Sequence, residues 1–442
     1  MQCANGFLLN QVVRRAWNWS GYVISDCDAI QTMMIPGAAI GGVGAHRMLG
    51  HSYSMTGAAA VFDGIKNGCD SNCGSPYTAF GDEAIATGLV TEAMLNVSVR
   101  RMLRPLFQLG LFDPIAEQPY TMLGWDDVGT AQARKLALDG ARQSLVLLQN
   151  PVVKGQPVLP LLKNTRVLVV GPHFDATTVL LGQYVGSVCP DERVCSGPNH
   201  TQNCHLRPSN CMVPLVEWIN QTNGEGGTTV GTRGTNGCTG LGRPRCSGGK
   251  QTCNSSDPFR YDPPVNRSLT LSQMTEINRA ANQSRGYDAV VLAVGYCASE
   301  CEGNDREILG LYPGEQQLYD AVISALSGTE TKVVVVLING GPVSVGNMKN
   351  RSAAIIQTGF PGQSGGQAIA ETLFGVTNPS GKLTTTIYNA DYAVGIPMSG
   401  MPWVDTELRP HMGFPGRATL TPGRTYRYFT GTPEFEFVSI TM

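Results

Sequence analysis

The sequence is poor in charged residues, and the charges that it has nearly cancel. Charged residues make up 15% of the 442 residues, with 32 basic against 34 acidic side chains, whereas an average soluble domain has about 25%. There is no basic excess to attract nucleic acid or an anionic membrane surface. No window approaches the roughly 18–20 uncharged apolar residues of a membrane span. We therefore expect no nucleic-acid partner and no membrane partner.

Glycine and cysteine are plentiful. The chain has 53 glycines and 13 cysteines, and many of the cysteines lie between Cys189 and Cys253. That segment has no C-x-x-C pair and few histidines, so disulfide bonds are a better interpretation than a zinc module. We expect the cysteines of this segment to be disulfide-bonded, with one of them pairing outside it or remaining free.

Acceptor sites for N-glycosylation agree with an oxidising, secretory route, and we predict a secreted, extracellular protein. The opening residues Met1 to Ala4 supply neither the basic nor the apolar region of a signal peptide. We therefore expect that the natural N-terminus is missing from this sequence. The acceptors are Asn18, Asn96, Asn199, Asn220, Asn254, Asn266, Asn282 and Asn350.

The second part of the chain alternates continuous apolar runs with helical segments. Runs of this kind are typical of parallel strands buried on both faces, and the alternation predicts an α/β sandwich with a mostly parallel sheet. Between about 185 and 264 neither periodicity is present, so we predict a disulfide-rich insertion outside the core. The predicted strands are 166–170, 288–294, 332–338 and 353–357, and the predicted helices are 313–326 and 366–373.

The first part of the chain has weaker signals. Residues 21–25 (GYVIS) predict a short buried strand that ends at Asp26. An apolar stripe from Leu95 to Leu109 predicts a helix that Pro105 should kink. A second helix is predicted over 130–148, capped by Asp126 and Asp127, and 151–162 reads as a linker. The expected organisation is a first domain at 1–125, a helix and interdomain linker at 126–163, and the sandwich domain at 164–442.

One candidate chemistry is that of a serine hydrolase. Residues 362–366 (GQSGG) match G-x-S-x-G between a predicted strand and a predicted helix, which makes Ser364 a candidate nucleophile. Asp391 or Asp405 and then His411 follow in the order of that fold. The whole triad, however, would lie within a short stretch that leaves little room for the intervening sheet. The alternative is a glycine-rich turn in which Ser364 makes only local hydrogen bonds.

A second candidate chemistry uses paired carboxyl groups. Asp26 directly follows a predicted buried strand, which is where a parallel barrel places its catalytic side chains. Glu300 and Glu302 follow another strand, in a loop that also contains Asp305 and Arg306. Glycoside hydrolysis needs two carboxyl groups, one ionised and one protonated. The alternative for the second loop is a solvated acidic surface.

Residues 21–30 (GYVISDCDAI) resemble the nucleophile segment of glycoside hydrolase family 3, in particular its plant-type β-xylosidase branch. That branch has S-D-C-D where many β-glucosidases have S-D-W. The likeness runs almost end to end and leaves out only 185–264. Further matching segments, in the family's order, are 68–74, 88–91, 109–113, 141–150, 359–363, 373–375, 378–379 and 422–427.

The resemblance implies a retaining exo-β-glycosidase that removes terminal β-D-xylosyl or α-L-arabinofuranosyl residues from xylan-type oligosaccharides, without a metal or organic cofactor. By position, Asp26 matches the nucleophile and Glu302 the acid/base, with Glu300 the near rival for that role. The Cys27 side chain takes the place of the tryptophan of β-glucosidases and implies contact with a pentoside. Its alternative is a buried apolar cysteine without substrate contact.

The sequence also departs from the family's pattern. About 125 residues precede the linker, whereas a whole (β/α)8 barrel needs about 250, so we expect a remnant consisting of the C-terminal part of such a barrel. Residues 434–439 also differ from the family's corresponding segment. Three functional hypotheses therefore remain: a retaining exo-β-glycosidase, a non-catalytic sugar-binding relic of the same fold, and a serine hydrolase. The oligomeric state is not predicted.

Overall fold

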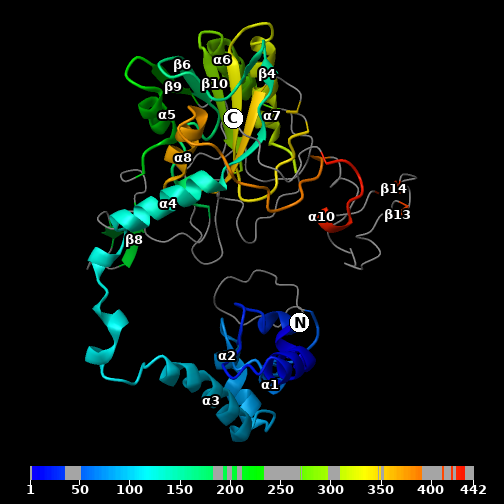
Figure 1. The fold of residues 1–442 in the computed structure, drawn as a ribbon. Helices are drawn as coiled ribbons and strands as arrows, with labels where there is room; N and C mark the ends of the chain where they lie inside the picture. The colour runs from blue at the N-terminus through cyan, green and yellow to red at the C-terminus, as the bar shows by residue number, and fades with distance from the viewer. Residues whose placement is uncertain are drawn as a thin grey trace. The chain divides into compact units, whose positions relative to one another are not determined.

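In the computed structural model the chain forms two compact units, Met1–Val128 and Gly129–Met442 (Figure 1). Within the described residues, no helix is long and apolar enough to cross a membrane. The same residues contain no cluster of three or more histidine, cysteine, aspartate or glutamate side chains that could hold a metal ion. The described residues are 2–34, 51–182, 193–196, 202–206, 212–232, 269, 271–296, 309–346, 348–349, 353–390, 411–412, 420–421 and 425–433.

The second unit is built on a six-stranded sheet, of which β6, β9 and β10 are labelled in Figure 1. The strand order is β3-β12-β11-β10-β6-β9. All neighbouring strands in it run parallel except β3, which pairs antiparallel with β12 at one edge. The mostly parallel sheet predicted from the apolar runs is therefore confirmed. The strands are β3 (Val146–Gln149), β6 (Arg166–Val170), β9 (Thr228–Thr232), β10 (Ala289–Gly295), β11 (Lys332–Ile338) and β12 (Ala353–Gly359).

Both faces of this sheet are covered by helices, which explains why its central strands are apolar at nearly every position. Alternate residues of a strand point to opposite faces, so Val167 packs on one side of β6 while Leu168 packs on the other. One face packs on α4 (Ala131–Ser144), α5 (Leu215–Asn223) and α8 (Gly365–Leu373). The other packs on α6 (Leu271–Ser284) and α7 (Pro313–Ala325). The result is a three-layer α/β sandwich.

The segment predicted as a helix and linker contributes to this sandwich. Thr130, rather than Asp126 or Asp127, caps α4, because its side chain accepts a hydrogen bond from Ala133 N. The helix ends at Ser144, and the following residues form the edge strand β3 instead of extending the helix to 148. The stretch 151–162 contains a short hairpin, β4 (Val152–Val153) with β5 (Gln156–Pro157). The prediction that the helix continues to 148 was therefore wrong, because 146–149 form β3, whereas the boundaries of the helix and interdomain linker at 126–163 stay a prediction.

The prediction that 185–264 lies wholly outside the core was also wrong. Helix α5 and strand β9 lie within it, and β9 pairs with β6 along its whole length as the other edge of the sheet. A separate antiparallel pair, β7 (Arg193–Ser196) with β8 (Gln202–Leu206), also belongs to this stretch. The side chains of its cysteines lie outside what the structure describes, so its predicted disulfides stay a prediction. Further short elements among the described residues of the unit are η7 (Thr178–Leu181), β13 (His411–Met412), β14 (Leu420–Thr421) and α10 (Thr425–Tyr428).

The first unit is helical around one pair of parallel strands, β1 (Ile24–Ser25) and β2 (Ser71–Asn72). Small apolar clusters join the helices, one of them around Ile30, Met33 and Met34. The predicted helix with Pro105 is present as α3, and it continues past the proline to Gln108. The interpretation of this unit as part of a barrel stays a prediction. The helices are α1 (Gly57–Asn67), α2 (Pro76–Ala86), α3 (Glu92–Gln108) and the short η1 (Gln2–Ala4), η2 (Phe7–Ala16), η3 (Gln31–Met33), η4 (Ile115–Glu117), η5 (Pro119–Met122) and η6 (Trp125–Asp127).

Candidate active site

The first candidate residue, Asp26, directly follows the last residue of β1 and is exposed to solvent. Strand β1 is shorter than the predicted 21–25, because only Ile24 and Ser25 pair with β2, opposite Ser71 and Asn72. The carboxyl end of a parallel strand is where side chains are presented to a ligand in α/β folds. The location of Asp26 is thus one from which a carboxylate can reach a substrate.

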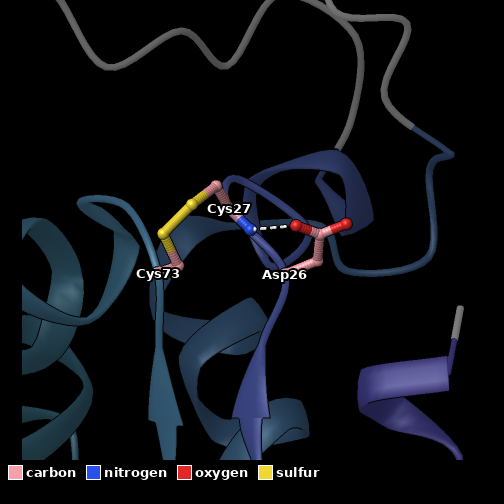
Figure 2. The surroundings of a disulfide bond; sticks show 3 residues. All are labelled: Asp26, Cys27 and Cys73. Carbon is pink, nitrogen blue, oxygen red and sulfur yellow. Dashed lines mark hydrogen bonds between the residues drawn. A yellow bond between two sulfur atoms is a disulfide. The ribbon is translucent and has the colours of Figure 1, made fainter. Parts of the chain in front are cut away.

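The turn after Asp26 is held by its neighbours (Figure 2). The Asp26 Oδ1 atom accepts a hydrogen bond from Cys27 N at 2.7 Å, which fixes one of its two oxygens. Asp28 N donates to Cys73 O at 3.0 Å, so the turn is also attached to the residue that follows β2. A disulfide bond joins Cys27 to Cys73 across the ends of the two strands.

This disulfide changes the interpretation of Cys27. The side chain is neither buried nor a free thiol, so the alternative of a buried apolar cysteine was wrong. The disulfide closes a loop with a sequence separation of 46 residues, and a cross-link of this kind stabilises a fold chiefly by restricting the unfolded chain. Contact between Cys27 and a sugar stays a prediction.

At the opposite end of β2 lies a buried acid that the sequence analysis did not assign, Asp70. Its side chain has no exposed area and forms ion pairs with Arg14 and, at 3.0 Å, with Arg101. The same carboxylate accepts a hydrogen bond from Val23 N at 2.9 Å. Burial lowers the pKa of Arg14, while the neighbouring Asp70 carboxylate acts in the opposite direction. This is a buried charge with its partners in place.

Two further cysteines of the described residues, Cys3 and Cys69, are free thiols that pack in the same apolar cluster. A hydrogen bond from the Cys69 thiol lowers the pKa of Cys3 to about 7, against the effect of burial. The same contact, together with burial, raises the pKa of Cys69. Burial is also the main cause that raises the pKa of Tyr77, whose hydroxyl donates to Cys69 O at 2.9 Å.

The second pair of candidates, Glu300 and Glu302, lies outside the described residues, as do Asp305 and Arg306. The strand that leads to them, β10, is fully buried and ends at Gly295. The Tyr296 hydroxyl donates to Gly310 O at 2.7 Å and to Leu309 O at 3.1 Å. The two ends of the intervening segment are therefore held together at the carboxyl edge of the sheet.

That edge of the sheet also contains a buried histidine. His173 follows β6, and its backbone N donates to Ala293 O in β10 at 3.2 Å. Burial lowers the pKa of His173 to about 4, although a backbone hydrogen bond with Gly295 acts in the opposite direction. Its Nε2 atom has no hydrogen-bond partner among the described residues. The imidazole is therefore neutral at pH 7.

Ser364, the candidate nucleophile of a serine hydrolase, lies between β12 and α8, as the motif predicts. It is half-buried at the start of α8, and its side chain makes no capping hydrogen bond. Gly362 in this turn has φ of 79°, a conformation that favours glycine. The proposed partners Asp391 and Asp405, and the His411 side chain, lie outside what the structure describes.

Comparison with known proteins defines the class of this fold. Residues 145–424 match the model of the glycosyl hydrolase family 3 C-terminal domain. The chain belongs to glycosyl hydrolase family 3.

Two named plant proteins and one solved structure are similar over nearly the whole chain. Beta-D-xylosidase 1 of Arabidopsis thaliana is 31% identical over 438 residues, which are 98% of this chain and 45% of that protein. Beta-xylosidase/alpha-L-arabinofuranosidase 2 of Medicago sativa subsp. varia is 30% identical, over 98% of this chain and 46% of that protein. The structure of a GH3 exo-beta-xylosidase (XlnD) in complex with a xylobiose aziridine activity-based probe has a TM-score of 0.72 at 27% identity. That match covers 99% of this chain and 46% of the other. The chain thus spans about half the length of the relatives it matches.

Proposed function

We propose that this chain forms part of an exo-acting glycosidase that releases terminal β-D-xylosyl residues from xylan-type oligosaccharides. The observation that carries the proposal is the exposed carboxylate of Asp26 at the end of a parallel strand, within the S-D-C-D segment. The names of the plant relatives support a xyloside substrate. The second of those names also supports terminal α-L-arabinofuranosyl residues as an alternative substrate.

In the proposed mechanism, Asp26 attacks the anomeric carbon while Glu302 protonates the departing glycosidic oxygen. The bond between carbon and leaving group breaks as the ester bond to Asp26 forms. Glu302, now ionised, then takes a proton from the water that hydrolyses this ester, and the anomeric configuration is retained. Because the Asp26 Oδ1 atom already accepts a hydrogen bond from Cys27 N, its Oδ2 atom is the better candidate for the attacking oxygen.

A covalent trapping experiment tests this assignment. A 2-deoxy-2-fluoro-β-D-xyloside with a good leaving group should leave a fluoroxylosyl ester on the peptide that contains Asp26, found by mass spectrometry after digestion. Asp26→Asn should remain unlabelled. An ester on another carboxylate would overturn the assignment, and binding of xylobiose without any label would favour the sugar-binding alternative. Labelling of Ser364 by a fluorophosphonate would favour the serine hydrolase.

The acid/base assignment makes a separate prediction. Glu302→Ala should lower the hydrolysis of xylobiose by about 10²–10⁴-fold, the usual contribution of a general acid. Turnover of 2,4-dinitrophenyl β-xyloside should fall much less, because a good leaving group needs little protonation. The rates on both substrates measure this difference directly. Glu300→Ala is the matched control, and the selective pattern in that variant instead of Glu302→Ala would reverse the two roles.

A further inference from the structure

Strand β1, which leads to Asp26, is attached at both of its ends to the four residues 70–73. The first of them, Asp70, precedes β2, and the last, Cys73, follows it. Asp70 bonds to Val23, the residue before β1, whereas Cys73 is joined to Cys27, which lies two residues after β1. Asp26 is therefore located between an ionic attachment on one side and a covalent attachment on the other.

The Asp70 carboxylate, which makes the ionic attachment, is not accessible to a substrate. The carboxylate of Asp70 is fully buried, and its Oδ2 atom accepts from both Arg14 and Val23 N. Its Oδ1 atom accepts from Arg101 Nη1 at 3.0 Å. Arg14 comes from η2 and Arg101 from α3, so one buried acid joins two helices to the strand. The Asp70 side chain therefore holds other parts of the first unit together and does not contact a ligand.

The main chain of Asp70 also bonds to Val23. Asp70 N donates to Val23 O at 2.8 Å, so side chain and main chain together bond both polar groups of the Val23 backbone. Arg14 Nη1 also donates to Gly21 O at 2.8 Å, two residues before Val23. The entry into β1 is thus fixed by a main-chain hydrogen bond from Asp70 N together with two bonds that depend on the Asp70 carboxylate or on its partner Arg14.

We propose that Asp70 is a positioning residue for the reaction, because it fixes the register and direction of β1 and thereby the location of the Asp26 carboxylate. The inference rests on the proposed role of Asp26 as the nucleophile. Asp26 itself makes a described side-chain hydrogen bond only to Cys27 N, so its location depends on where β1 lies. A shift of about 1 Å at a reacting group can cost about 10²-fold in rate.

The test measures how fast Asp26 is trapped by the 2-deoxy-2-fluoro-β-D-xyloside. Asp70→Asn keeps the shape of the side chain but removes its charge, which should release Arg14 and Arg101 from their ion pairs. We expect the maximal trapping rate to fall about 10²-fold, with little change in the concentration that gives half of that rate. Asp63→Asn is the matched control, because its carboxylate is half-buried in the same unit and accepts from Ser54 Oγ instead. That variant should be trapped at the wild-type rate.

A graded series separates positioning from general loss of folding. Arg101→Gln removes one of the two ion pairs and should slow trapping by about 10-fold, whereas Arg101→Lys retains a cation and should recover part of the rate. Peptide mapping of the Cys27–Cys73 disulfide and hydrogen exchange of β1 report whether each variant is folded. If Asp70→Asn does not fold, the comparison of Arg101→Gln with Arg101→Lys carries the test.

The outcomes distinguish this inference from the function on which it rests. Absence of labelling at Asp26 in the unmodified protein contradicts the proposed function. Labelling in the unmodified protein, with an unchanged rate in folded Asp70→Asn or Arg101→Gln, contradicts the positioning role alone. A change confined to the half-maximal concentration also contradicts it, because that result would describe a residue that affects binding of the sugar.

Discussion

Replacement of Asp26 by alanine is expected to lower the turnover of an aryl β-xyloside by about 10⁴–10⁶-fold, the scale on which loss of a covalent nucleophile slows other enzymes. The variant keeps the disulfide and the hydrogen bond from Asp28 N to Cys73 O, and it loses only the bond from Cys27 N to Asp26 Oδ1. It removes the only atoms that can form the glycosyl ester in the proposed mechanism. Initial rates with p-nitrophenyl β-xyloside measure the loss.

The control for this prediction is Asp28→Asn, two residues further along the same turn. The Asp28 side chain faces Gly74, at which an added Cβ atom would lie 2.6 Å from the Asp28 Oδ1 atom. We expect that variant to retain most of the activity.

Addition of azide to Asp26→Ala should yield xylosyl azide of inverted configuration, because azide takes over the attack from the opposite face. Hydrolysis of the aryl β-xyloside by Asp26→Ala at the wild-type rate and with retained anomeric configuration would show that another group is the nucleophile.

The central strands of the second unit were predictable because burial on both faces leaves room only for apolar side chains. Strands β6 and β11 have the predicted bounds, and β10 and β12 differ from them by one or two residues. The edge strand β9 was missed for the opposite reason. Its residues 228–232 (TTVGT) are exposed or half-buried, so neither a continuous apolar run nor a clear alternation is present.

The end of α4 shows a different limit. Leu145, Leu147 and Leu148 continue the apolar character of the helix into β3, and a short apolar run has no period that separates a helix from a buried strand. Only the pairing of β3 with β12 settles the matter. The helix cap at Thr130 was within reach of the sequence, because Thr is a favourable N-cap residue and directly precedes the helix.

The location of Asp26 in the candidate site was predictable from its motif, but the ion pairs and the disulfide that hold this part of the chain were not. The location of Asp26 at the end of a strand follows from the apolar run that precedes it. The partners of Asp70 are 56 and 31 residues away in the sequence, at Arg14 and Arg101, and no local pattern connects them. The Cys27–Cys73 bond was likewise out of reach, because 13 cysteines allow many connectivities. The one available signal in the sequence was that Asp70 is the only charged residue of the segment 68–74.

His173 provides the prediction with the largest expected effect on stability. Its pKa is lowered to about 4 by burial, from an ordinary value of 6.5. Between these two pH values the unfolded chain binds a proton that the folded chain does not, so stability rises with pH in this window. The contribution is fully present above pH 6.5, is lost progressively as the pH falls, and levels off below about pH 4. The shift corresponds to about 3 kcal/mol of unfolding free energy.

We expect His173→Asn to remove this part of the pH dependence. The measurement is hydrogen exchange of the β6 and β10 peptides between pH 7 and pH 4, corrected for the intrinsic exchange rate, which reports the local free energy of opening. Asparagine leaves a smaller side chain in a buried place, so His173→Asn should be less stable at pH 7, and it should lose less on acidification than the unmodified protein. His51→Asn, at an exposed histidine of the first unit, controls for replacement of a histidine elsewhere.

An equal loss of stability on acidification in His173→Asn and in the unmodified protein would show that the His173 imidazole takes up its proton without unfolding. The acid sensitivity of the sheet would then come from carboxylates such as Glu371, whose pKa is lowered because hydrogen bonds from Arg142 and Gln367 outweigh the effect of burial.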